Sequence, residues 1–479
     1  MSNPGHAAVS SRPSLLLLDE DTRGHLWAAL REFAETYLSN VSKMDVAPRL
    51  DVSGVRAFAE DFSFAQPEDP AELFRRVAQG LLSNQVHTPH PCYFGLFNPA
   101  PTTMSIFADA LVAALNPQLA AWSHSPLAVE IEMHVLRSLA AKFGIAPEAA
   151  DGTFTTGGAE ANQTALLAAL AAKWPQFLSD GVRGIPGEPV FYVSSEGHHS
   201  FLKAARVSGL GESAIRYARA GSDLKIDVDL LRQAIREDRK QGLAPFMLVA
   251  TAGTTGAGTI DPLQRLATIA REEHLWFHVD AAWGGAAVLV PELRSTLDGV
   301  EQADSITFDS HKWLSVSMGA GMYLTRHANS LARLFALSTA YMPKEGDQLA
   351  ICDPYTHSLQ WSRRFTGLKL FLSLAAAGWT GYEQALRQQT RVGHVLRTRL
   401  AESGWSIVNQ TPLPLVCFTN RERLPDLAAH QDLVNAVVAS GKAWISTIQL
   451  GESKAPALRA CITNYRTDES HVETLIECL

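Results

Sequence analysis

Hydrophobic residues near the N-terminus recur at helical spacing. They lie three or four positions apart over residues 22–42, at Leu26, Leu30, Phe33, Tyr37 and Val41. This spacing predicts an amphipathic helix, and residues 70–82 predict a second one after a polar stretch with little pattern. Two such helices cannot bury both apolar faces by themselves. We therefore expect residues 1–95 to form a helical segment that packs on another body, such as a partner subunit.

Short apolar runs alternate with helical segments from about residue 105 onward. The runs that predict strands are Gly152–Thr155, Val190–Val193, Ala214–Tyr217, Phe246–Ala250, Trp276–Val279 and Ser305–Phe308. Helical patterns cover residues 103–116, 126–143, 159–173, 199–208, 227–241 and 263–274. This alternation predicts an α/β fold with a mostly parallel sheet covered by helices on both faces, which we assign to residues 96–365.

The pattern changes again near residue 365. Two helices precede four strand-like runs, in the order Leu368–Ala377, Tyr382–Ser403, Trp405–Ile407, Leu415–Phe418, Ala443–Thr447 and Leu458–Thr463. We assign residues 366–479 to a small α+β domain. In the large domain, Asp261 is expected to cap the helix that Pro262 starts, and Gly242 to end the helix before it.

Composition and charge exclude several classes of protein. The 479 residues are 46% hydrophobic and 19% charged, which is ordinary for a globular protein and excludes a disordered or collagen-like chain. A net charge of −8 argues against a nucleic-acid-binding protein. The five cysteines include no Cys-x-x-Cys pair, and the apolar run Leu15–Leu18 is too short for a signal peptide or a membrane span. We therefore expect a cytoplasmic protein without disulfides, nucleic-acid partners or membrane segments.

Polar residues follow several predicted strands at their carboxyl ends, where ligands bind in open α/β sheets. Residues 155–162 (TTGGAEAN) join a strand to a helix, and their small side chains let backbone N–H groups approach an anion at the helix start. The alternative is a tight turn that needs glycine only for its geometry. Because the chain contains no Gly-x-x-x-x-Gly-Lys-[Ser/Thr] motif, a nucleoside-triphosphate loop is excluded.

Three further segments carry ionisable side chains at the same edge. Asp280 ends an apolar strand and needs a strong donor or cation there, although a helix cap or a structural salt bridge is the alternative. Lys312 lies between a strand and Trp313, where a partly buried amine is a usable nucleophile. His198 opens a helix, where an imidazole can stack on a ring or move protons. An anion-binding turn, a carboxylate and a lysine are the parts that pyridoxal phosphate requires.

These segments resemble the pyridoxal-phosphate-dependent group II amino acid decarboxylases, which include aromatic-L-amino-acid, glutamate, histidine and diaminobutyrate decarboxylases. The resemblance runs from His90 to Asn464. It is carried by HPCYFG (90–95), SHSPLAVEIE (123–132), TTGGAEAN (155–162), EGHHSFLKAA (196–205), ATAGTTGAGTID (250–261), HVDAAWGG (278–285), ADSITFDSHKW (303–313), QWSRRFTGLKLF (360–371) and LRACITN (458–464). It implies a fold-type I enzyme, an amino acid substrate, and a homodimer whose active site is built from both chains.

The resemblance also implies roles for single residues. Lys312 matches the lysine that binds the cofactor aldehyde, and Asp280 the partner of the pyridine nitrogen. His198 matches the histidine that stacks on the cofactor ring, with Ala282 on the opposite ring face. The remaining implied cofactor contacts are Gly158, Ala159, Thr254, Ser310 and His311. The expected substrate contacts are Tyr93, Phe94, Trp122 and Arg459.

Two of these assignments have plain alternatives. Arg459 matches an arginine that contacts the substrate carboxylate in relatives, but an exposed strand residue is an equal interpretation. His87, His90 and Cys92 are the residues that could suggest a metal, yet prolines separate them and a fourth ligand is missing, so no metal site is predicted.

The stretch 342–362 resembles the family's mobile catalytic loop. Within it, Tyr355 is predicted to protonate the substrate α-carbon, and a packing or surface role is the alternative. Because aldehyde-forming relatives commonly alter His198 or this tyrosine, the presence of both favours release of an amine. The aromatic residues near position 93 favour an aromatic amino acid. The alternatives are a decarboxylation-dependent oxidative deaminase, an acidic or diamino acid decarboxylase, another lyase or an aminotransferase of the same fold type, and a non-catalytic interaction protein.

Overall fold

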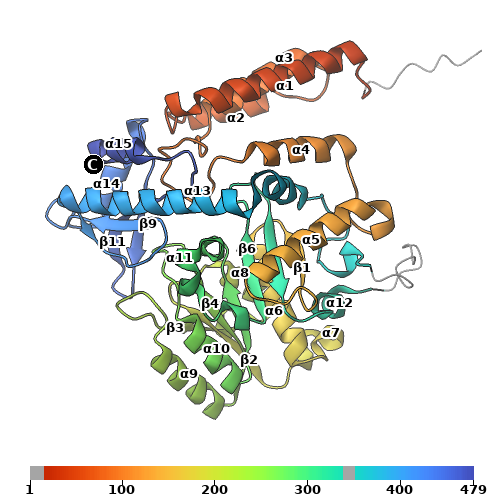
Figure 1. Ribbon diagram of the computed structural model, residues 1–479, viewed down its shortest axis with the longest axis vertical. Coiled ribbons are helices and arrows are strands. Elements are labelled where there is room, and N and C mark those ends of the chain that lie inside the picture. The colour runs from red at the N-terminus through yellow and green to blue at the C-terminus, as the bar shows by residue number, and fades with distance from the viewer. Residues whose placement is uncertain (1–15, 338–350) are drawn as a thin grey trace, which may run out of the picture. The chain divides into compact units, whose positions relative to one another are not determined.

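The computed structural model describes residues 16–337 and 351–479, and the chain divides into two compact units, Met1–His87 and Thr88–Leu479. The first unit contains α1 (Glu20–Asn40), α2 (Val52–Glu60) and α3 (Pro70–Ser83), all shown in red and orange in Figure 1. Helices α1 and α3 confirm the two predicted helices. The patternless stretch between them contains one short helix that was not predicted, α2, and Asp51 caps it by accepting a hydrogen bond from Ser53 N at 3.1 Å.

The second unit is built around a seven-stranded sheet with the strand order β1-β7-β6-β5-β4-β2-β3. Its strands are β1 (Asp151–Thr155), β2 (Glu188–Ser194), β3 (Ile215–Ala218), β4 (Leu243–Thr251), β5 (Trp276–Asp280), β6 (Ser305–Asp309) and β7 (Gly321–Thr325). All six predicted strands are confirmed. Strands β2 to β6 run parallel, whereas β7, which was not predicted, lies antiparallel between β1 and β6. Its apolar run is only three residues long and follows a serine- and glycine-rich stretch.

Helices cover both faces of this sheet, as the alternating pattern predicted (Figure 1). One face packs against α5 (Pro126–Lys142), α9 (Val228–Lys240) and α10 (Leu263–Glu272). The other face packs against α6 (Gly158–Lys173), α8 (Ser200–Val207) and α12 (Ser330–Phe335). The second unit also contains the helices α4 (Thr103–Leu115), α7 (Phe177–Asp180) and α11 (Pro291–Arg294).

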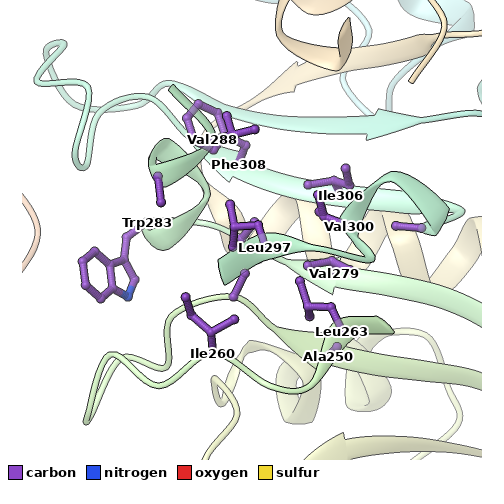
Figure 2. Packing of buried hydrophobic residues seen from close by; sticks show 14 of the residues in the cluster. Ala250, Ile260, Leu263, Val279, Trp283, Val288, Leu297, Val300, Ile306 and Phe308 are labelled. Carbon is purple, nitrogen blue, oxygen red and sulfur yellow. The ribbon is translucent and has the colours of Figure 1, made fainter. Parts of the chain in front are cut away.

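Strands β5 and β6 present different chemistry on their two faces. Val279 of β5 and Ile306 of β6 lie beside Leu297 and Val300 in the apolar core (Figure 2). The alternate residues face the other way, towards α6, and most of them are polar: Trp276, His278, Asp280, Ser305, Thr307 and Asp309. Because successive side chains of a strand point to opposite faces, one apolar-looking run carries both a core and a polar row.

Two helix boundaries were predicted from single residues. Gly242 follows α9 in the left-handed region at φ +83°, which confirms it as the helix end. Asp261 does not cap α10, because its carboxylate accepts hydrogen bonds from Ile226 N at 2.9 Å and Thr251 N at 2.8 Å. Asp261 thus connects the segment after β4 to the segment before α9, and its complete burial raises its pKa to about 6.

A four-stranded antiparallel sheet follows, with the order β10-β11-β9-β8. Its elements are β8 (Ser406–Ile407), β9 (Leu415–Thr419), α14 (Leu427–Ala439), β10 (Ser446–Leu450), β11 (Ala455–Cys461) and α15 (Glu469–Cys478). Helix α13 (Leu368–Glu402) extends from beside α4 to this sheet (Figure 1). The two helices predicted here are confirmed, because Gly378 adopts a non-helical φ of +63° and separates two helical segments within α13.

The three-part division at residues 95 and 365 stays a prediction. Among the described helices, none combines the length and the apolar character needed to cross a bilayer.

Candidate active site

Lys312 and Asp309 form an ion pair at the end of β6. The Lys312 Nζ atom lies 2.9 Å from Asp309 Oδ2, with side-chain exposures of 21% and 2%. The ring of Phe97 lies 5.9 Å from the same ammonium nitrogen. Asp309 was not among the predicted site residues, although strand alternation places it on the same sheet face as Asp280.

The turn before α6 lies directly against this ion pair. A Cβ atom at Gly158 would lie 2.9 Å from Asp309 Oδ2 and 3.4 Å from Ala282 Cβ, so only glycine leaves room there. The first N–H groups of α6, including those of Gly158 and Ala159, have no acceptor within the helix. A helix start with free N–H groups attracts an anion, which is the role predicted for this turn.

His311 and Ser310 hold the adjoining turn. His311 Nδ1 accepts a hydrogen bond from Ala320 N at 3.2 Å, and burial lowers the pKa of this imidazole, which keeps it neutral. The Ser310 hydroxyl donates its proton to Ala320 O at 2.9 Å, so this proton is not free to bind another acceptor. Contacts of either side chain with a phosphate group stay predictions.

Asp280 lies at the end of β5 with 5% of its surface exposed. Its Oδ2 atom accepts a hydrogen bond from Asn162 Nδ2 at 2.9 Å, and its Oδ1 atom accepts one from Ala282 N at 3.2 Å. Asn162 lies one turn into α6, at the end of the TTGGAEAN motif, and was not among the predicted site residues. The spacing of four residues from Gly158 was the only indication that it faces the sheet.

His198 completes this group of side chains just before α8. Its Nδ1 atom accepts a hydrogen bond from Ser200 N at 3.2 Å. Loss of hydration lowers the pKa of His198, and the charge of Lys312 lowers it further, whereas the charge of Asp280 raises it. These electrostatic effects show that the structure gathers the predicted histidine, aspartate and lysine in one place.

Arg459 approaches from the small sheet. It is 2% exposed, which rules out the exposed alternative, and it donates to Thr255 O at 3.0 Å and to Gly95 O at 2.7 Å. Its guanidinium carbon lies 4.8 Å from the Phe97 ring. Phe97 therefore contacts the cations of both Lys312 and Arg459. Thr254, also predicted, is fully buried in the turn after β4, where its hydroxyl accepts from Thr259 N at 3.1 Å.

Tyr93 and Phe94 anchor the loop that precedes Phe97. The Tyr93 ring packs on Trp444 at 5.1 Å, and burial raises its pKa. Phe94 is fully buried, and its backbone N–H donates to Trp444 O at 2.9 Å. The contacts of both residues tie this loop to the small sheet, and their roles as substrate walls stay predictions.

Trp122 and Tyr355 lie together in a different part of the second unit. Trp122 N donates to Asp353 Oδ1 at 2.7 Å, and Tyr355 N donates to Ala120 O at 3.1 Å. The Tyr355 ring packs 5.2 Å from Trp361. Residues 338–350 lie outside the described part of the predicted loop, whereas residues 354–356 form a short 3₁₀ helix. Over the described residues, no group of three or more His, Cys, Asp or Glu side chains is arranged to hold a metal ion.

The pyridoxal-dependent decarboxylase conserved domain matches residues 56–421 of this chain. The chain belongs to the pyridoxal-dependent decarboxylase family. It is therefore a pyridoxal-phosphate-dependent amino acid decarboxylase, as the motifs indicated. The gathered groups fit this cofactor, because a free helix start suits its phosphate, a buried carboxylate its ring nitrogen and a lysine amine its aldehyde.

Relatives of this decarboxylase differ in their reactions. It is 30% identical to the aromatic-L-amino-acid decarboxylase of Bacillus atrophaeus, over 83% of this chain and 82% of the relative. It is 28% identical to the phenylacetaldehyde synthase of Petunia hybrida, over 87% of this chain and 83% of the relative. The crystal structure of Oryza sativa TDC with PLP and tryptamine superposes with a TM-score of 0.88 at 26% identity, covering 96% of this chain and 98% of the other.

Proposed function

We propose that this decarboxylase removes the α-carboxylate of an aromatic L-amino acid and releases the amine. The observation that carries the proposal is the buried Phe97 ring, which lies 5.9 Å from Lys312 Nζ and 4.8 Å from the Arg459 guanidinium. An aromatic wall beside the reactive amine suits an aromatic side chain. The likeness to the Bacillus atrophaeus enzyme and to the tryptamine-bound structure supports the same substrate class.

Different residues of this chain are suited to bind different parts of the cofactor. Bound pyridoxal phosphate supplies a ring that takes up the electron pair left when carbon dioxide departs. Lys312 would hold the cofactor aldehyde through its amine, and Asp280 would keep a proton at the ring nitrogen. Gly158 and Ala159 bind the phosphate through their backbone N–H groups. His198, kept neutral by its lowered pKa, and Ala282 would hold the cofactor ring between them.

Arg459 is suited to orient the substrate. Its Nε and Nη1 atoms are held by backbone carbonyls, while Nη2 has no hydrogen-bond partner among the described residues. A buried guanidinium N–H without an acceptor is costly, and a carboxylate is its strongest acceptor. We infer that Arg459 receives the substrate α-carboxylate until it leaves.

A second product is favoured by the relatives that are named as aldehyde synthases. The overall reaction would then be amino acid, dioxygen and water to aldehyde, carbon dioxide, ammonia and hydrogen peroxide, with dioxygen reduced to peroxide by the two electrons that the substrate carbon loses. The two reactions share the loss of carbon dioxide. They differ in whether a proton or dioxygen reaches the substrate carbon first.

The deciding experiment is a product assay with the purified protein loaded with cofactor. Each of the twenty amino acids and diaminobutyrate would be tested with and without oxygen, following carbon dioxide, amine, aldehyde and peroxide. We expect amine from an aromatic amino acid, in equal yield under both conditions. Equimolar aldehyde and peroxide would establish the second reaction, and turnover confined to acidic or diamino acids would refute the aromatic class. Lys312→Ala serves as the inactive control.

We also propose a cytoplasmic homodimer with an active site built from both chains. Within the described residues, Leu26, Phe33 and Tyr37 of α1 are half-buried, whereas Trp27 and Leu30 remain 57% and 41% exposed, which leaves an apolar patch for a partner surface to cover. Deleting residues 1–85 should abolish the dimer in light scattering. Co-expressing Lys312→Ala with Tyr355→Phe, in which amine release should be slow, should restore fast amine release only if Lys312 and Tyr355 of one site come from different chains. A soluble, active monomer after the deletion would refute the proposal.

A further inference from the structure

Asn162 is the point where four structural elements meet. Its amide nitrogen donates to Asp280 Oδ2 of β5 and to Ser200 Oγ of α8, both at 2.9 Å. Its amide oxygen accepts from Thr307 Oγ1 of β6 at 2.7 Å and from His278 Nε2 of β5 at 3.1 Å. The side chain is 1% exposed, and both ends of its amide are therefore satisfied without water.

These partners determine which way the amide points. If it were rotated by half a turn, its oxygen would face the Asp280 carboxylate and its NH₂ group would face the Thr307 hydroxyl and His278. Two acceptors would then lie in contact in a buried site, at a cost that the observed arrangement avoids. The Asn162 N–H group consequently points towards Asp280.

The same reasoning fixes the protons further along β5. The Asn162 oxygen can only accept, so His278 Nε2 carries the proton. Burial lowers the pKa of His278 to about 4, so the imidazole is neutral and its Nδ1 atom must accept from Ser305 Oγ at 2.8 Å. The Ser305 oxygen in turn accepts from the indole N–H of Trp276, also at 2.8 Å. An indole nitrogen can only donate.

A one-way chain of hydrogen bonds results, and every donor in it points towards Asp280. It runs through Trp276, Ser305, His278, Asn162 and Asp280. Trp276, His278 and Asp280 are alternate residues of β5, and Ser305 pairs with His278 in the parallel register. Aligned hydrogen bonds polarise one another in a low-dielectric interior. The hydrogen bond from Trp276 to Ser305 therefore strengthens the one from Asn162 to Asp280.

We propose that Asn162 is a positioning residue for Asp280, acting as the last donor of this chain. The proposal rests on the proposed role of Asp280 as partner of the cofactor's ring nitrogen. With Oδ2 held by Asn162 and Oδ1 by Ala282 N, the carboxylate has one orientation. Asn162 thereby sets how firmly Asp280 keeps a proton on that nitrogen.

The test measures the ring nitrogen directly. Protein reconstituted with ¹⁵N-labelled pyridoxal phosphate would be examined by NMR without substrate, and cofactor affinity would be measured by absorbance titration. Asn162→Leu keeps a similar volume but removes the donor. We expect its ring-nitrogen resonance to move from the protonated towards the neutral position, and the cofactor dissociation constant to rise about ten- to a hundredfold.

A remote variant and a control make the result specific. Trp276→Phe removes only the first donor and should shift the resonance in the same direction by a smaller amount. Ser200→Ala removes the other acceptor of the Asn162 amide and should leave the resonance unchanged. If Asn162→Leu does not fold, Trp276→Phe becomes the deciding variant. An unchanged ring-nitrogen resonance in Trp276→Phe would contradict the proposed chain of hydrogen bonds.

The inference and the proposed function can fail separately. Asp280→Ala should move the ring-nitrogen resonance all the way to the neutral position. If it does not, the proposed role of Asp280 is itself wrong. If Asp280→Ala moves it while Asn162→Leu and Trp276→Phe both retain the wild-type resonance and affinity, Asp280 keeps its role and Asn162 is only a packing residue.

Discussion

The Lys312 ammonium lies 2.9 Å from the Asp309 carboxylate, although only 2% of the Asp309 side chain is exposed. The pair connects the last residue of β6 with the lysine that follows three positions later. It differs from the exposed ion pairs of this protein, such as Arg206 with Glu212, in which both side chains are more than half exposed. Shielding from water makes the attraction between Lys312 and Asp309 stronger.

This difference predicts a measurable coupling. In protein without cofactor, a double-mutant cycle of Asp309→Asn and Lys312→Met should give an interaction free energy of about 1–2 kcal/mol by chemical denaturation. The matched cycle of Arg206→Met and Glu212→Gln should give less than about 0.5 kcal/mol, because both partners are solvated. Equal couplings at the two pairs would mean that burial adds nothing to the Lys312 pair.

Gly158 should be far less tolerant of a side chain than Gly157. A Cβ atom at Gly158 would lie 2.9 Å from Asp309 Oδ2, so Gly158→Ala must displace the carboxylate and should weaken cofactor binding about tenfold or more. At Gly157 a Cβ atom would meet His311 Cε1 at an ordinary 3.6 Å, and the extended φ of 166° suits any residue. Absorbance titration of both variants measures the difference. Similar affinities in the two variants would contradict the packing argument.

His278 should make the fold less stable in mild acid. Its ordinary pKa is 6.5, and burial lowers it to about 4 in the fold, so between these values the unfolded chain binds more protons. The contribution of His278 to the free energy of unfolding is fully present above pH 6.5, and it falls by about 3 kcal/mol as the pH drops to 4. His278→Gln should remove this dependence from the free energy of unfolding.

Asp261 acts in the opposite direction over the same range. Burial raises its pKa to about 6, so its contribution is present at low pH and is lost as the pH rises through that value. The difference between wild type and His278→Gln, followed by urea denaturation from pH 4 to 7, is therefore the quantity to measure. Parallel curves for the two proteins would show that His278 takes up its proton equally in both states.

Tyr355 should decide the product if it is the proton donor. A phenol at close range contributes about 10²–10⁴-fold to a proton transfer. Tyr355→Phe should therefore slow amine release and raise the share of aldehyde, ammonia and peroxide when oxygen is present. Substrate affinity should change little, because the ring and its packing on Trp361 are kept.

Tyr341 provides the control, because it belongs to the same connecting segment between α12 and the short 3₁₀ helix at 354–356. Tyr341→Phe should leave rate and product ratio unchanged if Tyr355 is the donor. A normal Tyr355→Phe enzyme together with a slow or aldehyde-forming Tyr341→Phe enzyme would transfer the role to Tyr341. This comparison matters because Tyr355 is held by a backbone hydrogen bond to Ala120 and by packing on Trp361.

Local patterns were sufficient for most of the fold. The six strands of the large sheet that were predicted are all present, because strand and helix periodicities depend on the order of apolar residues over short distances. The misses have local reasons too. Strand β7 carries an apolar run of only three residues after a serine- and glycine-rich stretch, and α2 is only nine residues long. Asp261 looked like a cap by its position before Pro262, but its partners, Ile226 and Thr251, lie 35 and 10 residues away in the chain.

The sequence by itself determined the fold class, the family and the chemical types in the site, because the lysine, the aspartate and the glycine turn each follow a strand in a recognisable order. Only the tertiary structure decided how these groups support one another. Asn162 and Asp280 are 118 residues apart, and they meet because α6 covers the polar face of β5. Arg459 and Gly95 are 364 residues apart and meet where the small sheet packs beside the site. Such contacts depend on burial and strand register, which no short stretch of sequence specifies.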